Sequence, residues 1–323
     1  MTFRHLTAIA ATTLAVVTAS SAWAADNYPS KAITFVVPFA AGSGTDQAAR
    51  VIGKAMADEL KVPVVVDNKG GASGFIAAQY VAKAAPDGYT VFMTTNTTQV
   101  ANPYLFKKLP YDPVKDFTPV ELLFKGQMQL LVKPDSPYKT LADLVAAAKK
   151  TPGKLSFAAG NSSSQVGGEL FKQMAGIDVL YVPYKSNPQA ITDLIGGQFT
   201  FMFADAPTAL PQSQSGKLRA LAVSGNKRLA TALDVPTVSE AGVKNYEMSY
   251  WTAAYLPAGA PAAVVERLRT ALAKAAQSPE VKAFVDKISG EMVLAGPQGL
   301  TSFQAAEAKK WERVIKTAGI EPQ

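Results

Sequence analysis

Short apolar segments rich in β-branched residues alternate along this chain with longer segments in which apolar residues recur at a helical spacing. Residues 32–37 form the first predicted strand, and residues 45–60 follow as a predicted helix with Ala48, Ile52 and Met56 on one stripe. The same order returns over most of the chain. Strands and helices that alternate in this way predict an α/β fold with mostly parallel sheets.

The predicted elements are spread over the whole chain, and the last third is richer in helix than the rest. The predicted strands cover residues 32–37, 62–66, 89–94, 130–132, 155–158, 179–182, 199–203 and 218–223. The predicted helices cover residues 45–60, 72–84, 141–150, 164–175, 188–195, 262–276, 280–288 and 300–318. A chain of 323 residues is long enough for two such domains.

The first 24 residues have the pattern of a secretory signal. Arg4 and His5 give a basic start, residues 6–17 form an apolar run interrupted by threonines, and residues 22–24 supply the small-residue motif of a cleavage site. A membrane anchor is the alternative, but a helix that spans a bilayer needs about 20 apolar residues. We therefore expect cleavage after Ala24 and export to the periplasm.

The residues that most hydrolases and zinc proteins need are missing. His5 is the only histidine, it lies in the predicted signal, and the sequence has no cysteine. Serine–histidine triads, cysteine–histidine dyads and the usual zinc sites are therefore excluded beyond that segment. A hydrolase that uses two carboxylates stays open on composition alone. Because no local pairing of acidic residues stands out, we expect no catalysis, no metal and no cofactor.

The charge of the chain favours a small anionic ligand over a nucleic acid. Its formal net charge of +7 is scattered and not gathered into blocks. A protein that reads nucleic acid would show a basic stripe interleaved with aromatic residues, and no such stripe is present. A modest positive field does attract small anions.

Two strand–loop–helix units, residues 35–60 and 157–175, place a polar loop directly before a helix. The first turn of a helix presents unpaired backbone N–H groups and a partial positive charge. Such an N-terminus is a ready binding site for an anion. Two of these sites, one in each domain, would hold one anionic ligand in the cleft between them.

The first loop spans residues 38–46 and contains two glycines that let the backbone approach a ligand closely, Gly42 and Gly44. Thr45 or Asp46 is the expected helix cap. A plain strand-to-helix turn with no ligand would show the same composition. We leave that alternative open at this point.

A dinucleotide-binding loop is a second alternative for the same segment. Gly42 and Gly44 follow a strand, and Asp67 ends the next strand at the distance where a ribose ligand is expected. However, Gln47 occupies the place of the third glycine that this fingerprint requires. The sequence therefore disfavours a dinucleotide.

The second loop, residues 159–165, contains Asn161 followed by Ser162, Ser163 and Ser164. These side chains offer several hydrogen-bond donors to a carboxylate. The alternative is a solvated turn in which Ser162 or Ser164 caps the helix.

Asp205 follows the predicted strand 199–203 and precedes Pro207. Two roles for its carboxylate stay equally open. It orders a water or a loop N–H group at the cleft, or it caps the helix that begins at Pro207.

Several separated stretches have the order and spacing of one known family. They are YPSK at residues 28–31, VPFAAG at 37–42, VDNKGGA at 66–72, PDGYT at 86–90, VPYK at 182–185, GGQ at 196–198 and GKLRALAV at 216–223. Together they resemble the Bug-type substrate-binding proteins of tripartite tricarboxylate transporters. The resemblance runs from about Tyr28 to the C-terminus.

The resemblance implies an α/β, two-domain, periplasmic-binding-protein-like fold of type II, with a ligand cleft that closes between the domains. We expect a signal peptide at residues 1–24, a first domain made of residues 25–125 and 227–323, and a second domain at residues 126–226. The implied partners are a small carboxylate and the membrane permease subunits of the transporter, and a monomer is expected. A carboxylate sensor subunit and an exported carboxylate-dependent hydrolase are the alternatives.

The resemblance also implies that both loops hold a ligand carboxylate through backbone N–H groups, hydroxyls and ordered waters. With Ala40 and Asp205 added, the expected ligand-binding residues are Phe39, Ala40, Ser43, Gly44, Thr45, Asp46, Asn161, Ser162, Ser163, Ser164 and Asp205. The chain departs from the usual family pattern at Ser43, Gln165, Ala204 and residues 249–253. Whether the ligand is a dicarboxylate, a tricarboxylate or an aromatic acid is therefore left open.

Overall fold

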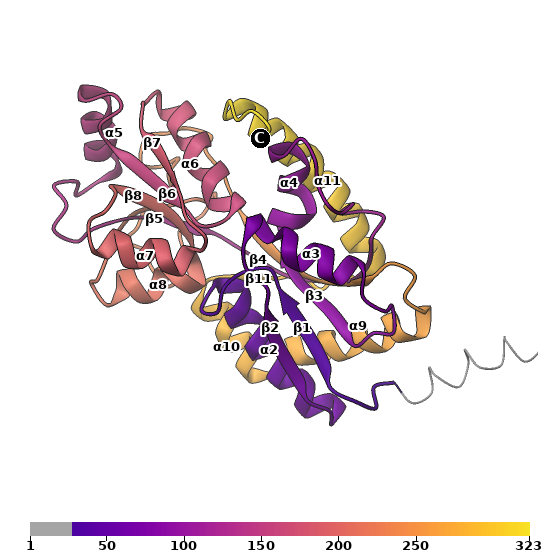
Figure 1. Ribbon diagram of the computed structural model, residues 1–323. Helices are drawn as coiled ribbons and strands as arrows, with labels where there is room; N and C mark the ends of the chain where they lie inside the picture. Colours follow the sequence, from indigo (N-terminus) through magenta and orange to yellow (C-terminus); the bar gives the residue numbers. More distant parts are fainter. Residues whose placement is uncertain (1–27) are drawn as a thin grey trace, which may run out of the picture.

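The strands of the computed structural model form two sheets, each covered by its own helices, and the two lobes lie side by side (Figure 1). The structure describes residues 28–323, so the predicted signal peptide lies outside the described residues. One sheet has six strands in the order β11-β4-β10-β3-β1-β2, and the other has five in the order β7-β6-β8-β5-β9. We call the first sheet with its helices the large lobe and the second the small lobe.

The large lobe is built from both ends of the described chain. Its strands are β1 (Ile33–Val37), β2 (Val64–Asn68), β3 (Thr90–Thr95), β4 (Phe117–Gly126), β10 (Tyr250–Pro257) and β11 (Glu291–Met292). Its helices are α2 (Gly44–Leu60), α3 (Phe75–Ala82), α4 (Asn102–Leu105), α9 (Ala262–Ala276), α10 (Pro279–Lys287) and α11 (Gly296–Thr317). Two short helical segments, η1 (Ala72–Gly74) and η2 (Thr97–Ala101), complete it.

The small lobe comes from the middle of the chain. Its strands are β5 (Met128–Val132), β6 (Ser156–Ala159), β7 (Leu180–Pro183), β8 (Phe201–Asp205) and β9 (Arg219–Val223). Its helices are α5 (Leu141–Lys150), α6 (Ser162–Ala175), α7 (Asn187–Ile195) and α8 (Ala206–Gln214).

Both sheets are mixed, so the prediction of mostly parallel sheets is wrong. Strand β1 is parallel to β2 and β3, and β6 is parallel to β7 and β8. In contrast, β10 is antiparallel to β3 and β4, and β5 is antiparallel to β8 and β9. The sequence analysis missed β4 and β10, which lie next to each other inside the large sheet. Almost every side chain of β10 is buried, so it lacks the alternation that marks a half-buried strand.

The chain passes between the lobes at two places that lie against each other. Gln127 alone separates β4 from β5, and the chain returns after β9. Ser224 ties the two crossings together, because its hydroxyl accepts a hydrogen bond from the Met128 N–H at 2.9 Å and donates to the Met248 carbonyl at 2.7 Å. The Gly225 N–H donates to the Gln127 side chain at 3.1 Å. The relative position of the lobes therefore depends on this small polar junction.

Within residues 28–323, no helix combines the length and apolar character that a membrane crossing requires.

Candidate ligand-binding site

A narrow pocket with a volume of about 30 Å³ lies where the two lobes meet. Its walls come from the starts of helices and the ends of strands in both lobes. The lining residues are Phe39, Ser43, Gly44, Thr45, Thr95, Met128, Gly160, Asn161, Ser163, Ser164, Ser186, Asn187, Asp205 and Tyr250. Both loops that the sequence analysis selected therefore open onto one space.

Ser43 is the residue that caps α2 at the first loop. Its backbone is extended, with φ −64° and ψ 159°, and its hydroxyl accepts a hydrogen bond from the Asp46 N–H at 3.3 Å. The prediction that Thr45 or Asp46 would cap this helix is wrong, because both already lie inside the first helical turn. Ser43 also lines the pocket, so the residue that caps α2 is part of the pocket wall.

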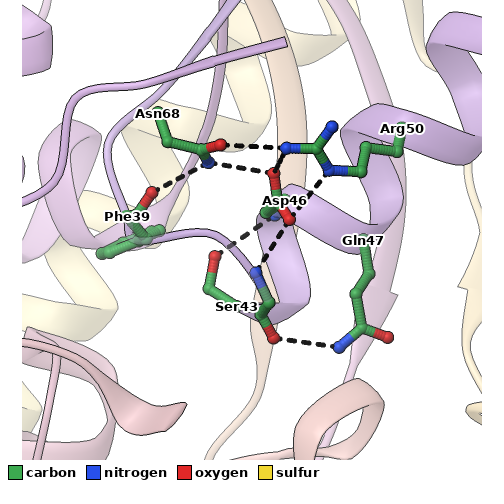
Figure 2. A network of polar contacts seen from close by, with 7 residues as sticks. Phe39, Ser43, Asp46, Gln47, Arg50 and Asn68 are labelled. Carbon is green, nitrogen blue, oxygen red and sulfur yellow. Dashed lines mark hydrogen bonds and ion pairs between the residues drawn. The ribbon is translucent and has the colours of Figure 1, made fainter. Parts of the chain in front are cut away.

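The side chain of Asp46 holds the first loop in place through hydrogen bonds and an ion pair (Figure 2). One carboxylate oxygen accepts from the Gly42 N–H at 2.8 Å and from the Arg50 side chain at 3.1 Å. The other accepts from the Asn68 amide at 2.9 Å and forms an ion pair with Arg50 at 2.9 Å. The Asn68 amide also donates to the Phe39 carbonyl at 3.0 Å. These contacts fix both ends of the loop without any residue of the small lobe.

The pKa of Asp46 reflects this network. Burial raises it, but hydrogen bonds from Arg50, Gly42 and Asn68 outweigh that effect, so the pKa is lowered below its ordinary value. The carboxylate is thus ionised at neutral pH and accepts hydrogen bonds only. Asp46 does not line the pocket, and its contacts indicate a supporting role.

Asn161 caps α6 at the second loop. Its backbone is extended and its side-chain oxygen accepts from the Ser164 N–H at 2.8 Å. The alternative in which Ser162 or Ser164 is the cap is therefore wrong. The hydroxyl of Ser162 instead donates to the side chain of Asn102 at 2.9 Å, and this residue does not line the pocket.

Ser163 joins the second loop to the large lobe. Its hydroxyl accepts a hydrogen bond from the Asn96 amide at 2.7 Å and lies 3.3 Å from the hydroxyl of Thr97. Both partners follow β3 and belong to the large lobe. Ser163 also lines the pocket, so this contact between the lobes lies at the pocket wall.

Asp205 ends β8 and points across the pocket towards the start of α2. One carboxylate oxygen accepts from the Asn187 amide at 2.8 Å. The other lies so close to Gly44 that a Cβ added there would be 1.9 Å from it. Its side chain makes no capping hydrogen bond to α8, so the structure favours the cleft role over the cap. Burial raises the pKa of Asp205, and hydrogen bonding from Asn187 and Gly44 opposes that rise.

Most of the predicted site residues line the pocket together. They are Phe39, Ser43, Gly44, Thr45, Asn161, Ser163, Ser164 and Asp205. Ala40, Asp46 and Ser162 lie outside its wall. The backbone of Ala40 lies against Gly70, where an added Cβ would be 3.0 Å from the Ala40 nitrogen.

The sequence analysis missed six lining residues, which are Thr95, Met128, Gly160, Ser186, Asn187 and Tyr250. One of these omissions had a readable signal. Ser186 caps α7 and Pro188 occupies its first turn, and serine followed by proline is a common helix start. A third helix N-terminus therefore borders the pocket, in addition to those of α2 and α6.

The pocket is suited to an anion that is bound by dipoles. Among the lining residues none is Lys, Arg or His, so helix N-termini and hydroxyls supply the positive potential. In the described part of the chain no cluster of three or more acidic, Cys or His side chains is arranged to hold a metal ion. Such a site can hold a carboxylate through backbone N–H groups and hydroxyls.

Comparison with known proteins gives a consistent picture. A family model described as tripartite tricarboxylate transporter family receptor matches residues 48–320. Protein BugT from Bordetella pertussis is 33% identical over 298 residues, which is 91% of this chain and 91% of BugT. The structure of an R. palustris protein with adipate has 34% identity and a TM-score of 0.89, covering 92% of this chain and 100% of that chain. The structure of the periplasmic binding protein BugD has 33% identity and a TM-score of 0.88, covering 92% and 100%.

Proposed function

The chain belongs to the tripartite tricarboxylate transporter receptor family, and from that premise we propose that its interlobe pocket binds one carboxylate group of a small organic acid. The protein is a Bug-type solute-binding protein with the expected α/β, two-domain, periplasmic-binding-protein-like fold. The residues that hold the carboxylate are the lining residues of the two loops.

The observation that carries this proposal is the convergence of α2 and α6 on one pocket. Their first turns contribute backbone N–H groups, and Ser43, Thr45 and Ser163 add hydroxyls. Hydrogen bonds to a charged group contribute about 1.5–3 kcal/mol each, so a few of them suffice for tight binding. The adipate in the R. palustris structure supports a small aliphatic acid as the ligand.

The proposed role is binding without turnover. A hydrolase that works with two carboxylates needs both beside the substrate, about 5–10 Å apart. Asp205 is the only carboxylate among the residues that line this pocket. None of the lining hydroxyls has a histidine beside it to act as a base.

We further propose that the protein is exported to the periplasm and delivers its ligand to a membrane transporter. The signal peptide would be cleaved after Ala24, and the mature chain would act in the periplasm as a monomer. Its membrane partners would be the permease subunits of a tripartite tricarboxylate-type transporter. Intact mass of the protein recovered from the periplasm tests the cleavage site, since each alternative site gives a different mass.

Thermal unfolding of residues 25–323 against a ligand panel tests the binding role. The panel contains mono-, di- and tricarboxylates, aromatic acids and neutral sugars, and each solution is checked for products after incubation. A ligand at 100 times its Kd adds about 2.7 kcal/mol of stability. Stabilisation by carboxylates alone, with no product, supports the proposal. Stabilisation by sugars only, or any turnover, contradicts it.

A further inference from the structure

Tyr250 lines the pocket, and its buried hydroxyl has no hydrogen-bond partner in the described part of the protein. Its side chain is 7% exposed and lines the pocket at the first residue of β10. Within residues 28–323, the only other buried side-chain polar atom without a partner is the amide nitrogen of Gln129. That residue does not line the pocket, and its amide oxygen accepts from Ser213 at 2.9 Å. Only the Tyr250 hydroxyl is both unpartnered and at the ligand site.

The position of the Tyr250 ring is set by its neighbours. Tyr250 pairs with Gly126 in the sheet, and a Cβ added at Gly126 would be 2.4 Å from the hydroxyl oxygen. The absence of a side chain at Gly126 therefore makes room for this ring. A buried hydroxyl without a partner is destabilising, whereas a phenylalanine would fill the same space without that penalty. Such a group at a pocket wall points to a partner on the ligand.

The hydroxyl of Tyr250 is a permanent donor. Burial raises its pKa well above the ordinary value of 10.0, and the nearby carboxylate of Asp205 raises it further. The phenol is therefore neutral at every physiological pH. It can donate its proton to an acceptor atom of the ligand.

The charge of the pocket decides what kind of acceptor fits. Asp205 is near enough to Tyr250 to affect its pKa, and no lining residue is cationic. A second ligand carboxylate at this end would meet a like charge with no counterion. A neutral oxygen would accept from Tyr250 without that repulsion.

We propose that the Tyr250 hydroxyl recognises a neutral oxygen substituent, a hydroxyl or keto group, on the bound acid, and so makes the protein select oxygenated acids over their deoxy counterparts. This inference rests on the proposed function, because the carboxylate of the same acid occupies the helix N-termini. Tyr250 is thus a specificity-determining residue.

Calorimetric titration with matched pairs tests the inference. The pairs are lactate and propionate, 3-hydroxybutyrate and butyrate, and malate and succinate. A site built to donate a hydrogen bond discriminates strongly against a ligand that lacks the acceptor, so the wild type is expected to prefer the oxygenated member by about tenfold or more in at least one pair. Tyr250→Phe is expected to abolish this preference and to leave the affinity for the deoxy member nearly unchanged.

Tyr246→Phe is the matched control. Tyr246 is equally buried, but its hydroxyl donates to the Gly167 carbonyl at 2.9 Å and does not line the pocket. Its loss is expected to lower stability and to preserve selectivity. Tyr250→Phe is expected to show no loss of ligand-free stability, because its hydroxyl has no internal partner.

Four results overturn the inference while the proposed function stands: every pair binds equally, Tyr250→Phe weakens both members of a pair alike, Tyr250→Phe clearly destabilises the ligand-free protein, or the preference persists in Tyr250→Phe. If no carboxylate of any class binds the wild type, the proposed function fails and this inference fails with it. A preference that persists in Tyr250→Phe assigns the selection to another residue.

Discussion

The loops that open α2 and α6 both place a helix N-terminus at the pocket, but they are held by different kinds of contact. The first loop is held inside the large lobe by an ionised carboxylate, Asp46, with Arg50 and Asn68 around it. The second loop is held by neutral side chains of the opposite lobe. Ser162 donates a hydrogen bond to Asn102, and Ser163 accepts one from Asn96.

This difference assigns the loops different parts in binding. The contacts that shape the first loop do not need the small lobe, so this anion site keeps its shape when the lobes separate. The contacts of Ser163 with Asn96 exist only while the lobes are together. We therefore infer that the first loop is the preformed half of the proposed site and that the second loop couples binding to closure.

Replacing Asp46 by asparagine should give the largest effect, because it removes the charge on which the first loop depends. Bonds to a charged group contribute about 1.5–3 kcal/mol, and we expect the free energy of unfolding to fall by that amount. Denaturant titration of the variant measures it.

Asp67→Asn is the control for Asp46→Asn. Its carboxylate is 39% exposed and pairs with Lys69 at 2.9 Å. Exposed pairs contribute little, so a loss below about 1 kcal/mol is expected. Equal losses at both positions would show that Asp46 is no special anchor and would remove the basis of the comparison.

Gly44→Ala should weaken ligand binding by preventing full closure. The new Cβ would be 1.9 Å from the Asp205 carboxylate and 3.2 Å from the Pro207 ring. Overpacking of this kind costs about 1–3 kcal/mol. We expect a lower affinity by calorimetry and a smaller ligand-induced compaction by small-angle scattering.

The double variant Gly44→Ala with Asp205→Ala separates the clash from any other effect of the alanine. Removing the carboxylate should restore compaction at least in part. If the single variant binds and closes like the wild type, the lobes do not meet at Gly44 in the liganded protein.

Ser163→Ala and Ser162→Ala distinguish two adjacent hydroxyls. Ser163 lines the pocket and bonds to Asn96, whereas Ser162 bonds to Asn102 outside it. A neutral hydrogen bond contributes about 0.5–1.5 kcal/mol. We expect Ser163→Ala to weaken ligand affinity and Ser162→Ala to lower stability at unchanged affinity, both measured by titration and thermal unfolding. Equal effects on affinity would mean that the loop acts as one unit.

The sequence predicted the two loops that meet at the pocket because their signals are local. A glycine- and serine-rich stretch before an amphipathic helix can be recognised without knowing the rest of the fold, as at residues 42–45 and 161–164. The local signal did not decide which residue caps each helix, because Ser43, Thr45 and Asp46 all have capping side chains.

The far wall of the pocket could not be predicted, because it depends on pairing between distant strands. Tyr250 and Thr95 reach the pocket through the antiparallel register that pairs Thr252 with Thr95. No local pattern encodes a register between segments so far apart. The role of Asp205 was equally open, since its contacts with Asn187 and Gly44, both distant in sequence, draw its carboxylate away from the helix that follows.

The smallest predicted effect concerns pH, because the contributions of Asp46 and Asp205 to the free energy of unfolding should change in opposite directions. The pKa of Asp46 is lowered, so its contribution to stability is present above the unfolded value of about 3.9 and is lost as pH falls. The pKa of Asp205 is raised by burial, so its contribution is present below about 3.9 and is lost as pH rises through the folded value.

Denaturant titration of the wild type, Asp46→Asn and Asp205→Asn from about pH 3 to about pH 7 measures these two dependences, because this range begins below the usual carboxyl pKa of about 3.9. The stability advantage of the wild type over Asp46→Asn should grow as pH rises, and its advantage over Asp205→Asn should shrink. The carboxyls of Glu121, which is buried, and Glu169, which is half-buried, also have raised pKa values. All three proteins keep both residues, so their contribution cancels in the differences. If the advantage over Asp46→Asn does not grow as pH rises, an ionised carboxylate does not hold the first loop, and the contrast between the two loops fails.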